Sequence, residues 1–280
     1  MNGKLILFWD FDAEWGAERS RSGGGPKPWG ALEFSCTERL LWVLEQFGVK
    51  ACFAVVGAVA LPGSRPYHDP GLIREIAAQG HEVASHAMRH EWLPGVGKGN
   101  LRQIIRQSKE ALETCVLQPV TTFAPPYNQP FDFWERGSIS LSERREVSRD
   151  RVDLGFLCQV LQEEGFTFCR VAYKPLGERL LSYRGYRKHF FPRIEIIRGI
   201  TTLRVNAFGF RTDTLYLIDH AIEENGFVVC FAHPHALSGN GPQSESHLIP
   251  FLERVQELVS IGRLEIVLPR TIMSVPLHKS

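Results

Sequence analysis

Residues 3–12 read Gly-Lys-Leu-Ile-Leu-Phe-Trp-Asp-Phe-Asp, an apolar run that ends in two aspartates. A short apolar run bounded by charge predicts a buried β-strand, which we place at residues 5–9. Asp10 and Asp12 interrupt the run too early for the apolar region of about 7–15 residues that a secretory signal requires. The run therefore predicts the first strand of a buried sheet.

Outward from this strand, apolar runs alternate with amphipathic stretches along the whole chain. Asp69 followed by Pro70 predicts a helix start, and Ser35 with Glu38 three residues later predicts another. The expected strands are residues 5–9, 51–56, 81–85, 120–123, 167–171, 227–232 and 264–268. Such alternation is typical of an α/β protein with a mostly parallel sheet, either open or curled into an incomplete barrel.

The length of 280 residues suggests two domains of about 150 residues, although α/β barrels of about 250 residues often form one domain. The continuous strand–helix alternation favours a single catalytic domain over residues 1–280. Two polar and aromatic stretches, around residues 125–150 and 173–200, are expected to be insertions into this domain.

The composition excludes several classes of partner. The chain has 32 Lys and Arg against 31 Asp and Glu, which gives a formal charge of +1. Proteins that bind nucleic acid or anionic membranes typically carry an excess of basic residues. No segment has the roughly 18 uninterrupted apolar residues of a membrane span. The six cysteines lie mostly in apolar runs without a CxxC pair, so we expect them to be reduced and the protein to be cytoplasmic.

Polar residues follow the expected strands at four places, residues 10–12, 85–90, 125–128 and 233–235. In open α/β sheets and in barrels, ligands bind at the carboxyl ends of the strands. His86 and His90 are four residues apart after one strand and would share a face if a helical turn begins near Ser85. The pair could then bind one cation, although two ordinary surface histidines would show the same spacing.

Asp10 and Asp12 lie two residues apart at the end of the first strand, so both carboxylates can point into one site. One could bind a metal ion while the other stays free as a base; alternatively, Asp12 only turns the chain. His233 and His235 follow the buried run at residues 228–232. A polar residue that leaves a core strand is a candidate catalytic group, and we favour His233 over His235 for this role.

Together and in this order, these motifs resemble the polysaccharide deacetylases (carbohydrate esterase family four), in a variant that has Asp-x-Asp in place of two adjacent aspartates. The resemblance extends from Asp10 to about Leu237 and implies an incomplete (β/α)7 barrel. It further implies that Asp10 is the catalytic base. Asp12, His86 and His90 would be the ligands of a divalent metal ion, which we expect to be zinc.

The same resemblance assigns two more residues. The backbone N–H of Tyr127, in the segment Ala124-Pro125-Pro126-Tyr127, would help to hold the oxyanion, and His233 would be the general acid. The implied reaction is removal of an N-acyl group, in the first place N-acetyl, from a small-molecule or oligosaccharide substrate that carries an amino sugar. Water activated by the metal ion attacks the amide while Asp10 accepts a proton.

This chain departs from the family pattern at two further points. Ala124 replaces the arginine that usually orients the base, and either Arg170 or Arg211 could supply the missing cation. The aspartate that usually orients the acidic histidine has no clear counterpart. Asp150 and Asp153 have a similar spacing but precede an expected helix, so an N-cap is the better interpretation.

Two alternatives remain open at the level of function. The same metal site could hydrolyse another non-peptide C–N bond, in an N-formyl sugar, a cyclic amide or a ureide. The chain could also be an inactive glycan-binding member of the family, which the complete set of site residues argues against.

Overall fold

The computed structural model describes residues 2–20, 29–128, 152–172 and 192–272. In these ranges ten strands form one sheet, in the order β6-β7-β5-β4-β3-β2-β1-β9-β8, with β10 also paired to β1. The strands are β1 (Gly3–Phe11), β2 (Cys52–Val55), β3 (Glu82–Ser85), β4 (Thr122–Phe123), β5 (Phe168–Val171), β6 (Glu195–Ile197), β7 (Ile200–Arg204), β8 (Ala207–Phe208), β9 (Phe227–Ala232) and β10 (Leu264–Ile266).

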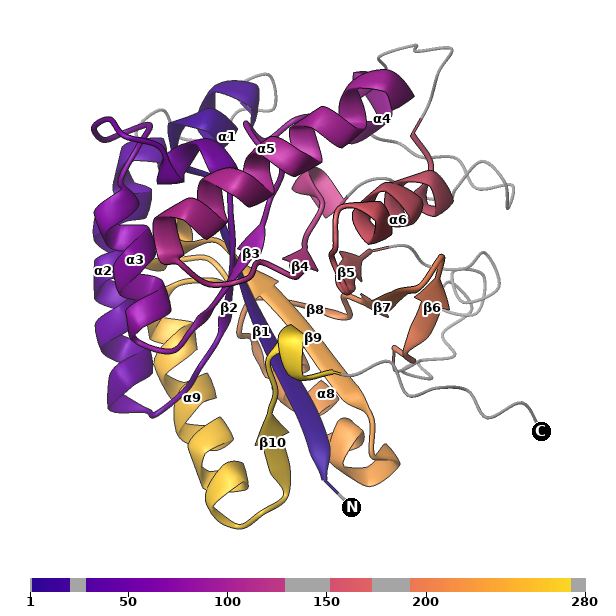
Figure 1. The fold of residues 1–280 in the computed structure, drawn as a ribbon. Coiled ribbons are helices and arrows are strands. Elements are labelled where there is room, and N and C mark those ends of the chain that lie inside the picture. The colour runs from indigo at the N-terminus through magenta and orange to yellow at the C-terminus, as the bar shows by residue number, and fades with distance from the viewer. Residues whose placement is uncertain (1, 21–28, 129–151, 173–191, 273–280) are drawn as a thin grey trace, which may run out of the picture.

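Helices cover the outer side of this sheet (Figure 1). They are α1 (Ala13–Ser20), α2 (Trp29–Gln46), α3 (Pro70–Ala78), α4 (Leu93–Val96), α5 (Lys98–Val116), α6 (Leu154–Glu163), α8 (Thr212–Glu224) and α9 (Glu245–Ser260). Asp69 caps α3 as expected, because its carboxylate accepts the N–H of Leu72. None of the helices in the described residues combines the length and apolar character that a membrane span needs.

One extended segment, residues 200–208, joins the two edges of the curled sheet. Its first half, β7, pairs in parallel with β5, and its second half, β8, pairs in parallel with β9. Between them, the N–H of Val205 donates to Val171 and the N–H of Asn206 donates to Val229. The sheet is therefore a curled, largely parallel barrel, and the predicted α/β fold class is confirmed.

Strand β1 separates two apolar layers. Leu5, Leu7 and Trp9 belong to the large core beneath the helices, whereas Ile6 and Phe8 face a small cluster inside the barrel. The other members of the inner cluster are mostly small: Cys52, Ala54, Ala84, Ala124, Phe168, Leu203 and Val229. Because side chains alternate along a strand, the inner face of β1 continues from Phe8 to Asp10.

One expectation about local structure is wrong. Helix α2 begins at Trp29, so Ser35 is no N-cap; it lies inside the helix and its Oγ donates to the carbonyl of Leu32. The helix begins earlier because a helical turn over residues 29–34 places the side chains of Trp29 and Phe34 in buried positions. The expected insertion at 173–200 contains β6 and the start of β7 at its end. Its other residues, 173–191, and residues 129–151 of the first insertion lie outside the described residues.

His81 lies at the amino end of the barrel strands, where it is 1% exposed and its Nδ1 accepts the N–H of Ala51. Burial, together with the charge of Lys50, lowers the pKa of His81 to about 4. The unfolded chain takes up a proton at His81 below a pKa of about 6.5, whereas the folded chain takes it up only near pH 4. The contribution of neutral His81 to the free energy of unfolding is therefore complete above pH 6.5 and is lost as the pH falls toward 4.

We expect the free energy of unfolding of the wild type to fall by about 3 kcal/mol relative to that of His81→Gln between pH 7 and pH 4. Urea unfolding at a series of pH values measures this difference. Glutamine is the matched variant because its side-chain oxygen accepts the same N–H without titrating. Parallel pH profiles for the two proteins would contradict the prediction.

Candidate active site

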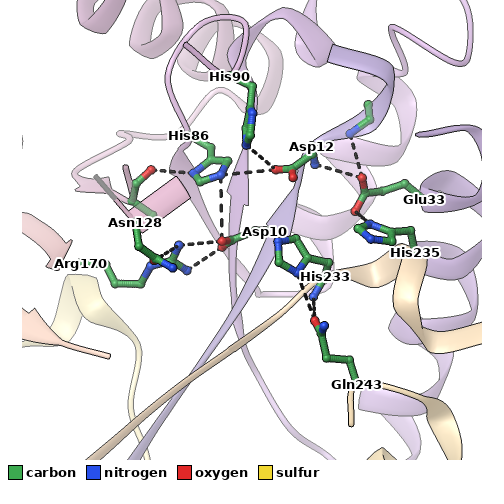
Figure 2. Close-up of polar contacts among 12 residues, drawn as sticks. Asp10, Asp12, Glu33, His86, His90, Asn128, Arg170, His233, His235 and Gln243 are labelled. Atoms are coloured by element: carbon green, nitrogen blue, oxygen red, sulfur yellow. Dashed lines mark hydrogen bonds and ion pairs between the residues drawn. The ribbon is translucent and has the colours of Figure 1, made fainter. Parts of the chain in front are cut away.

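Side chains from several strands meet at the carboxyl end of the barrel (Figure 2). Asp10 belongs to β1 and Asp12 follows it; His86 and His90 follow β3, Arg170 belongs to β5, and His233 follows β9. The parallel arrangement of these strands brings residues that are far apart in the sequence to one end of the fold.

Asp12, His86 and His90 bring three possible ligand atoms within 4.8 Å of one another. Oδ1 of Asp12 lies 3.3 Å from Nε2 of His86 and 3.4 Å from Nε2 of His90. All three side chains are buried. Two imidazoles and one carboxylate form a donor set suited to a divalent ion that keeps a position open for water or substrate.

The hydrogen bonds of His86 test whether these residues fit a cation. Nδ1 of His86 lies 2.6 Å from the carbonyl oxygen of Ala124, which can only accept, so Nδ1 carries the proton. In the neutral imidazole, Nε2 then presents a lone pair toward the carboxylate of Asp12. Burial also lowers the pKa of His90 to about 4, which keeps that ring neutral. Burial would lower the pKa of His86, but the carboxylates of Asp10 and Asp12 raise it. The Nε2 atoms of both imidazoles face one carboxylate oxygen of Asp12, an arrangement that fits a bound cation.

His86 and His90 converge by a different route from the expected helical turn. The segment between them is an irregular turn in which Ala87 and His90 have φ values of 62° and 57°. The carbonyl of Ala87 accepts both the N–H of Gly57 and the Oγ–H of Ser108. Hydrogen bonds from neighbouring segments therefore hold this irregular turn and bring the two imidazoles together, in place of the expected helical turn.

Arg170 is the cation that pairs with Asp10. Its two terminal nitrogens donate to the two carboxylate oxygens of Asp10, each at 2.6 Å, and the guanidinium lies over the rings of Phe8 and Phe231. Arg170 is 0% exposed. Arg211, the other candidate, lies exposed at the start of α8.

The charges around Asp10 determine its protonation state. Burial would raise the pKa of Asp10, but Arg170 and His86 outweigh this effect and lower the pKa below its ordinary value. Oδ2 of Asp10 lies 4.0 Å from Nε2 of His86. Asp10 is therefore an ionised carboxylate beside the three possible metal ligands.

Arg170→Met should lower the free energy of unfolding by about 3–5 kcal/mol, because it leaves the carboxylate of Asp10 buried without its partner. Urea unfolding measures the loss. The double variant Asp10→Asn/Arg170→Met should recover much of it, since no charge is then stranded. A loss below about 1 kcal/mol, or equal losses in the single and double variants, would contradict the role of this ion pair.

Tyr127 lies on the turn after β4, with φ 56°. Its ring contacts His90 edge-on, with centroids 4.4 Å apart, and contacts Trp92 at 5.7 Å. Asn128, the next residue, accepts a hydrogen bond from Arg170 through Oδ1 at 3.2 Å. Tyr127 therefore lies beside His90, one of the three possible ligands, and Asn128 ties the same turn to the Asp10–Arg170 pair.

His233 is held by Gln243. Oε1 of Gln243 accepts the backbone N–H of His233 at 2.6 Å and lies 3.1 Å from Nδ1 of its ring. Gln243 therefore occupies the orienting position for which the sequence offered no aspartate. Asp153 is instead the N-cap of α6, as expected, since it accepts the N–H of Phe156. Asp150 lies outside the described residues.

His235 points away from the three possible ligands and toward Glu33. Nδ1 of His235 lies 3.4 Å from Oε1 of Glu33, and its ring stacks on Trp29 with centroids 4.2 Å apart. Burial raises the pKa of Glu33, and the charge of His235 opposes this effect. Sequence reasoning does not identify Glu33 or Gln243, because neither ends a strand. Asn128 lies in the segment 125–128 that follows an expected strand, but no role is expected for it there.

Three comparisons relate the chain to known proteins. Residues 29–133 match the family model for polysaccharide deacetylase, a segment that includes His86, His90 and Tyr127. A chitooligosaccharide deacetylase of Sinorhizobium fredii is 36% identical over 92 residues, which are 32% of this chain and 40% of that protein. A peptidoglycan-N-acetylglucosamine deacetylase of Bacillus cereus is 28% identical over 102 residues, 36% of this chain and 42% of that protein.

The chain thus spans less than half the length of these curated relatives. Over the whole fold, it is similar to a solved structure from Mycobacterium smegmatis that is assigned to the polysaccharide deacetylases. The TM-score is 0.59 at 19% identity, and the similarity covers 98% of this chain and 94% of the other. This likeness shows a shared fold.

Proposed function

We propose that this chain, which belongs to the polysaccharide deacetylase family, is a metal-dependent hydrolase that removes an N-acetyl group from an amino sugar or a glycan precursor. The observation that carries the proposal is the joint placement of the ionised Asp10 carboxylate and the Asp12, His86 and His90 ligand set. Hydrolysis of the amide by water gives acetate and the free amine.

Asp12, His86 and His90 would hold the metal ion, for which we propose zinc because a mixed nitrogen and oxygen donor set suits it. A divalent cation there supplies Lewis acidity, which polarises the amide carbonyl and makes water more acidic. The chain's own base is Asp10, whose carboxylate accepts the proton of the attacking water. Arg170 holds both oxygens of that carboxylate and so fixes its orientation.

The other two assigned residues act on the oxygen and the nitrogen of the amide. The backbone N–H of Tyr127 would donate to the oxyanion that forms when water attacks, a form of stabilisation that is usually large. His233 would donate a proton to the nitrogen, because an amine leaves readily only once it is protonated. Gln243 holds Nδ1 of His233, which leaves Nε2 for this transfer.

Gln243→Ala should lower kcat about two- to tenfold, because one hydrogen bond of about 0.5–1.5 kcal/mol no longer orients His233. KM should change little, since Gln243 contacts the catalytic ring and its backbone. Gln243→Glu restores an acceptor and should restore most of kcat. Steady-state kinetics of the three proteins check this, and a fall in kcat that Glu does not rescue would contradict it.

A substrate panel tests the proposed function. It contains N-acetylglucosamine, short chitooligosaccharides, an N-formyl amino sugar, a cyclic amide and a ureide, incubated with protein whose metal content has been measured by elemental analysis. Mass spectrometry should detect loss of one acetyl group from an amino sugar, and acetate should appear in equal amount. Turnover confined to the formyl sugar, cyclic amide or ureide would favour the other C–N bonds; glycan binding without turnover in metal-loaded protein would favour an inactive member.

A further inference from the structure

Glu33 is a carboxylate with an unusual position, buried in the interior of α2 at 0% exposure. Within the described residues, its ion-pair partner is His235 rather than a lysine or arginine. A buried carboxylate is costly unless hydrogen bonds satisfy its oxygens. Figure 2 shows that the two oxygens of Glu33 serve two different parts of the site.

The first oxygen, Oε2, holds the backbone beside the possible metal ligand Asp12. It accepts the N–H of Asp12 at 3.1 Å and the N–H of Ala13 at 2.8 Å. Ala13 has φ 53°, in the left-handed region that residues other than glycine rarely adopt. Helix α1 begins at this residue, so Glu33 caps a helix from another segment and holds the strained turn that aims the Asp12 carboxylate.

The second oxygen, Oε1, lies 3.4 Å from Nδ1 of His235. Trp29, one turn before Glu33 on α2, stacks on the same imidazole. His235 is therefore held between two residues of α2, and its ring lies 5.3 Å from that of His233. A single carboxylate thus connects the ligand turn after β1 with the histidine segment after β9.

We propose that Glu33 is a positioning residue with two separable tasks: Oε2 fixes the turn that presents Asp12 to the metal ion, and Oε1 fixes the tautomer and orientation of His235. The proposal rests on the proposed function, because it takes Asp12 to be a metal ligand. Residues that hold metal ligands in place typically change metal affinity about 10–100-fold when they are removed.

Two variants of Glu33 separate these tasks. Glu33→Gln keeps one oxygen, which can accept both backbone N–H groups, but turns an NH₂ toward His235. Glu33→Met removes both sets of hydrogen bonds at similar volume. The matched control is Glu82→Met. Glu82 is also a buried carboxylate, and it accepts from Thr122 and from the N–H of Arg270, but it lies at the amino end of β3, away from His86 and the rest of the site.

Zn²⁺ titration of the metal-free proteins, with a competing chelator, measures the first task without any substrate. Kd should rise about 10–100-fold in Glu33→Met and stay within about threefold of the wild type in Glu33→Gln and Glu82→Met. An equal rise in Kd in Glu33→Met and Glu82→Met would mean that the weaker Zn²⁺ binding comes from a general loss of stability, and this would overturn the proposal. Unchanged Kd in Glu33→Met would overturn it too.

The imidazole ¹H–¹⁵N spectrum of the full chain measures the second task. The proton on Nδ1 of His235, assigned with the help of His235→Gln, should be lost in Glu33→Gln and kept in Glu82→Met. Its persistence in Glu33→Gln would overturn the second half of the proposal.

Failure of the wild type itself to bind Zn²⁺ would overturn the proposed metal-dependent function. Normal Zn²⁺ binding without turnover of any substrate would contradict that function and leave the metal titration of Glu33 decisive.

Discussion

Asparagine in place of Asp10 should lower kcat/KM by about 10²–10⁴-fold while the protein still binds its metal ion. The reason is that asparagine keeps the shape of the side chain and can still accept from Arg170, but it cannot take a proton from water. The group of possible metal ligands, Asp12 with His86 and His90, does not include Asp10. Steady-state kinetics and elemental analysis of the same preparation check both halves of the prediction.

The control for Asp10→Asn is Asp69→Asn, since asparagine is as good an N-cap as aspartate and α3 keeps its start. That variant should retain wild-type kcat/KM and metal content. Turnover in Asp10→Asn within about tenfold of the wild type would contradict the assignment of Asp10 as base. Metal loss in Asp10→Asn would instead make Asp10 a ligand.

Alanine in place of His86 should raise the Kd for Zn²⁺ by at least about 100-fold and abolish turnover at ordinary metal concentrations. Removal of a direct ligand should exceed the 10–100-fold effect that is typical of the residues around the ligands. The variant also loses the hydrogen bond that Nδ1 donates to Ala124. Zn²⁺ titration and kinetics at several metal concentrations measure the change.

His81→Ala is the matched control for His86→Ala, because both histidines are buried at opposite ends of β3. Both variants should lose stability, but only His86→Ala should lose metal affinity. Retained Zn²⁺ affinity in His86→Ala, or equal loss in the two variants, would contradict the ligand assignment.

The sequence predicted those parts of the site that depend on strand periodicity. Alternation along β1 predicts that Asp10 and Asp12 point into one site, and both lie beside Nε2 of His86. The parallel arrangement of the strands predicts that the polar ends of β3 and β9 meet at the same rim, as Figure 2 shows. Arg170 could also be named as a candidate, but its choice over Arg211 needed the pairing of β5 with β7, which sets Arg170 opposite the inner residue Leu203. Periodicity therefore predicts which face a residue occupies and not which distant partner it meets.

The remaining parts of the site depend on contacts that periodicity does not encode. The turn from His86 to His90 is held by Gly57, Ala58 and Ser108, which belong to other segments. Glu33 was missed because the helix was expected to begin at Ser35, and an acidic residue before a helix predicts exposure. Gln243 meets His233 through the path of a loop, which only the packed fold determines.

Asp10 is paired with an arginine on β5, whereas the family pattern would put that arginine at position 124. This placement has a consequence for protein engineering. Because Phe123 pairs with Cys169, the next residues, Ala124 and Arg170, lie side by side at about the 5 Å spacing of adjacent strands. Ala124 belongs to the inner layer with Ala54 and Ala84. We expect its small side chain to leave room for the guanidinium of Arg170, which binds Asp10. We therefore expect an arginine at position 124 to be accommodated only when position 170 carries a small residue, so the two positions should be exchanged together in an engineered variant.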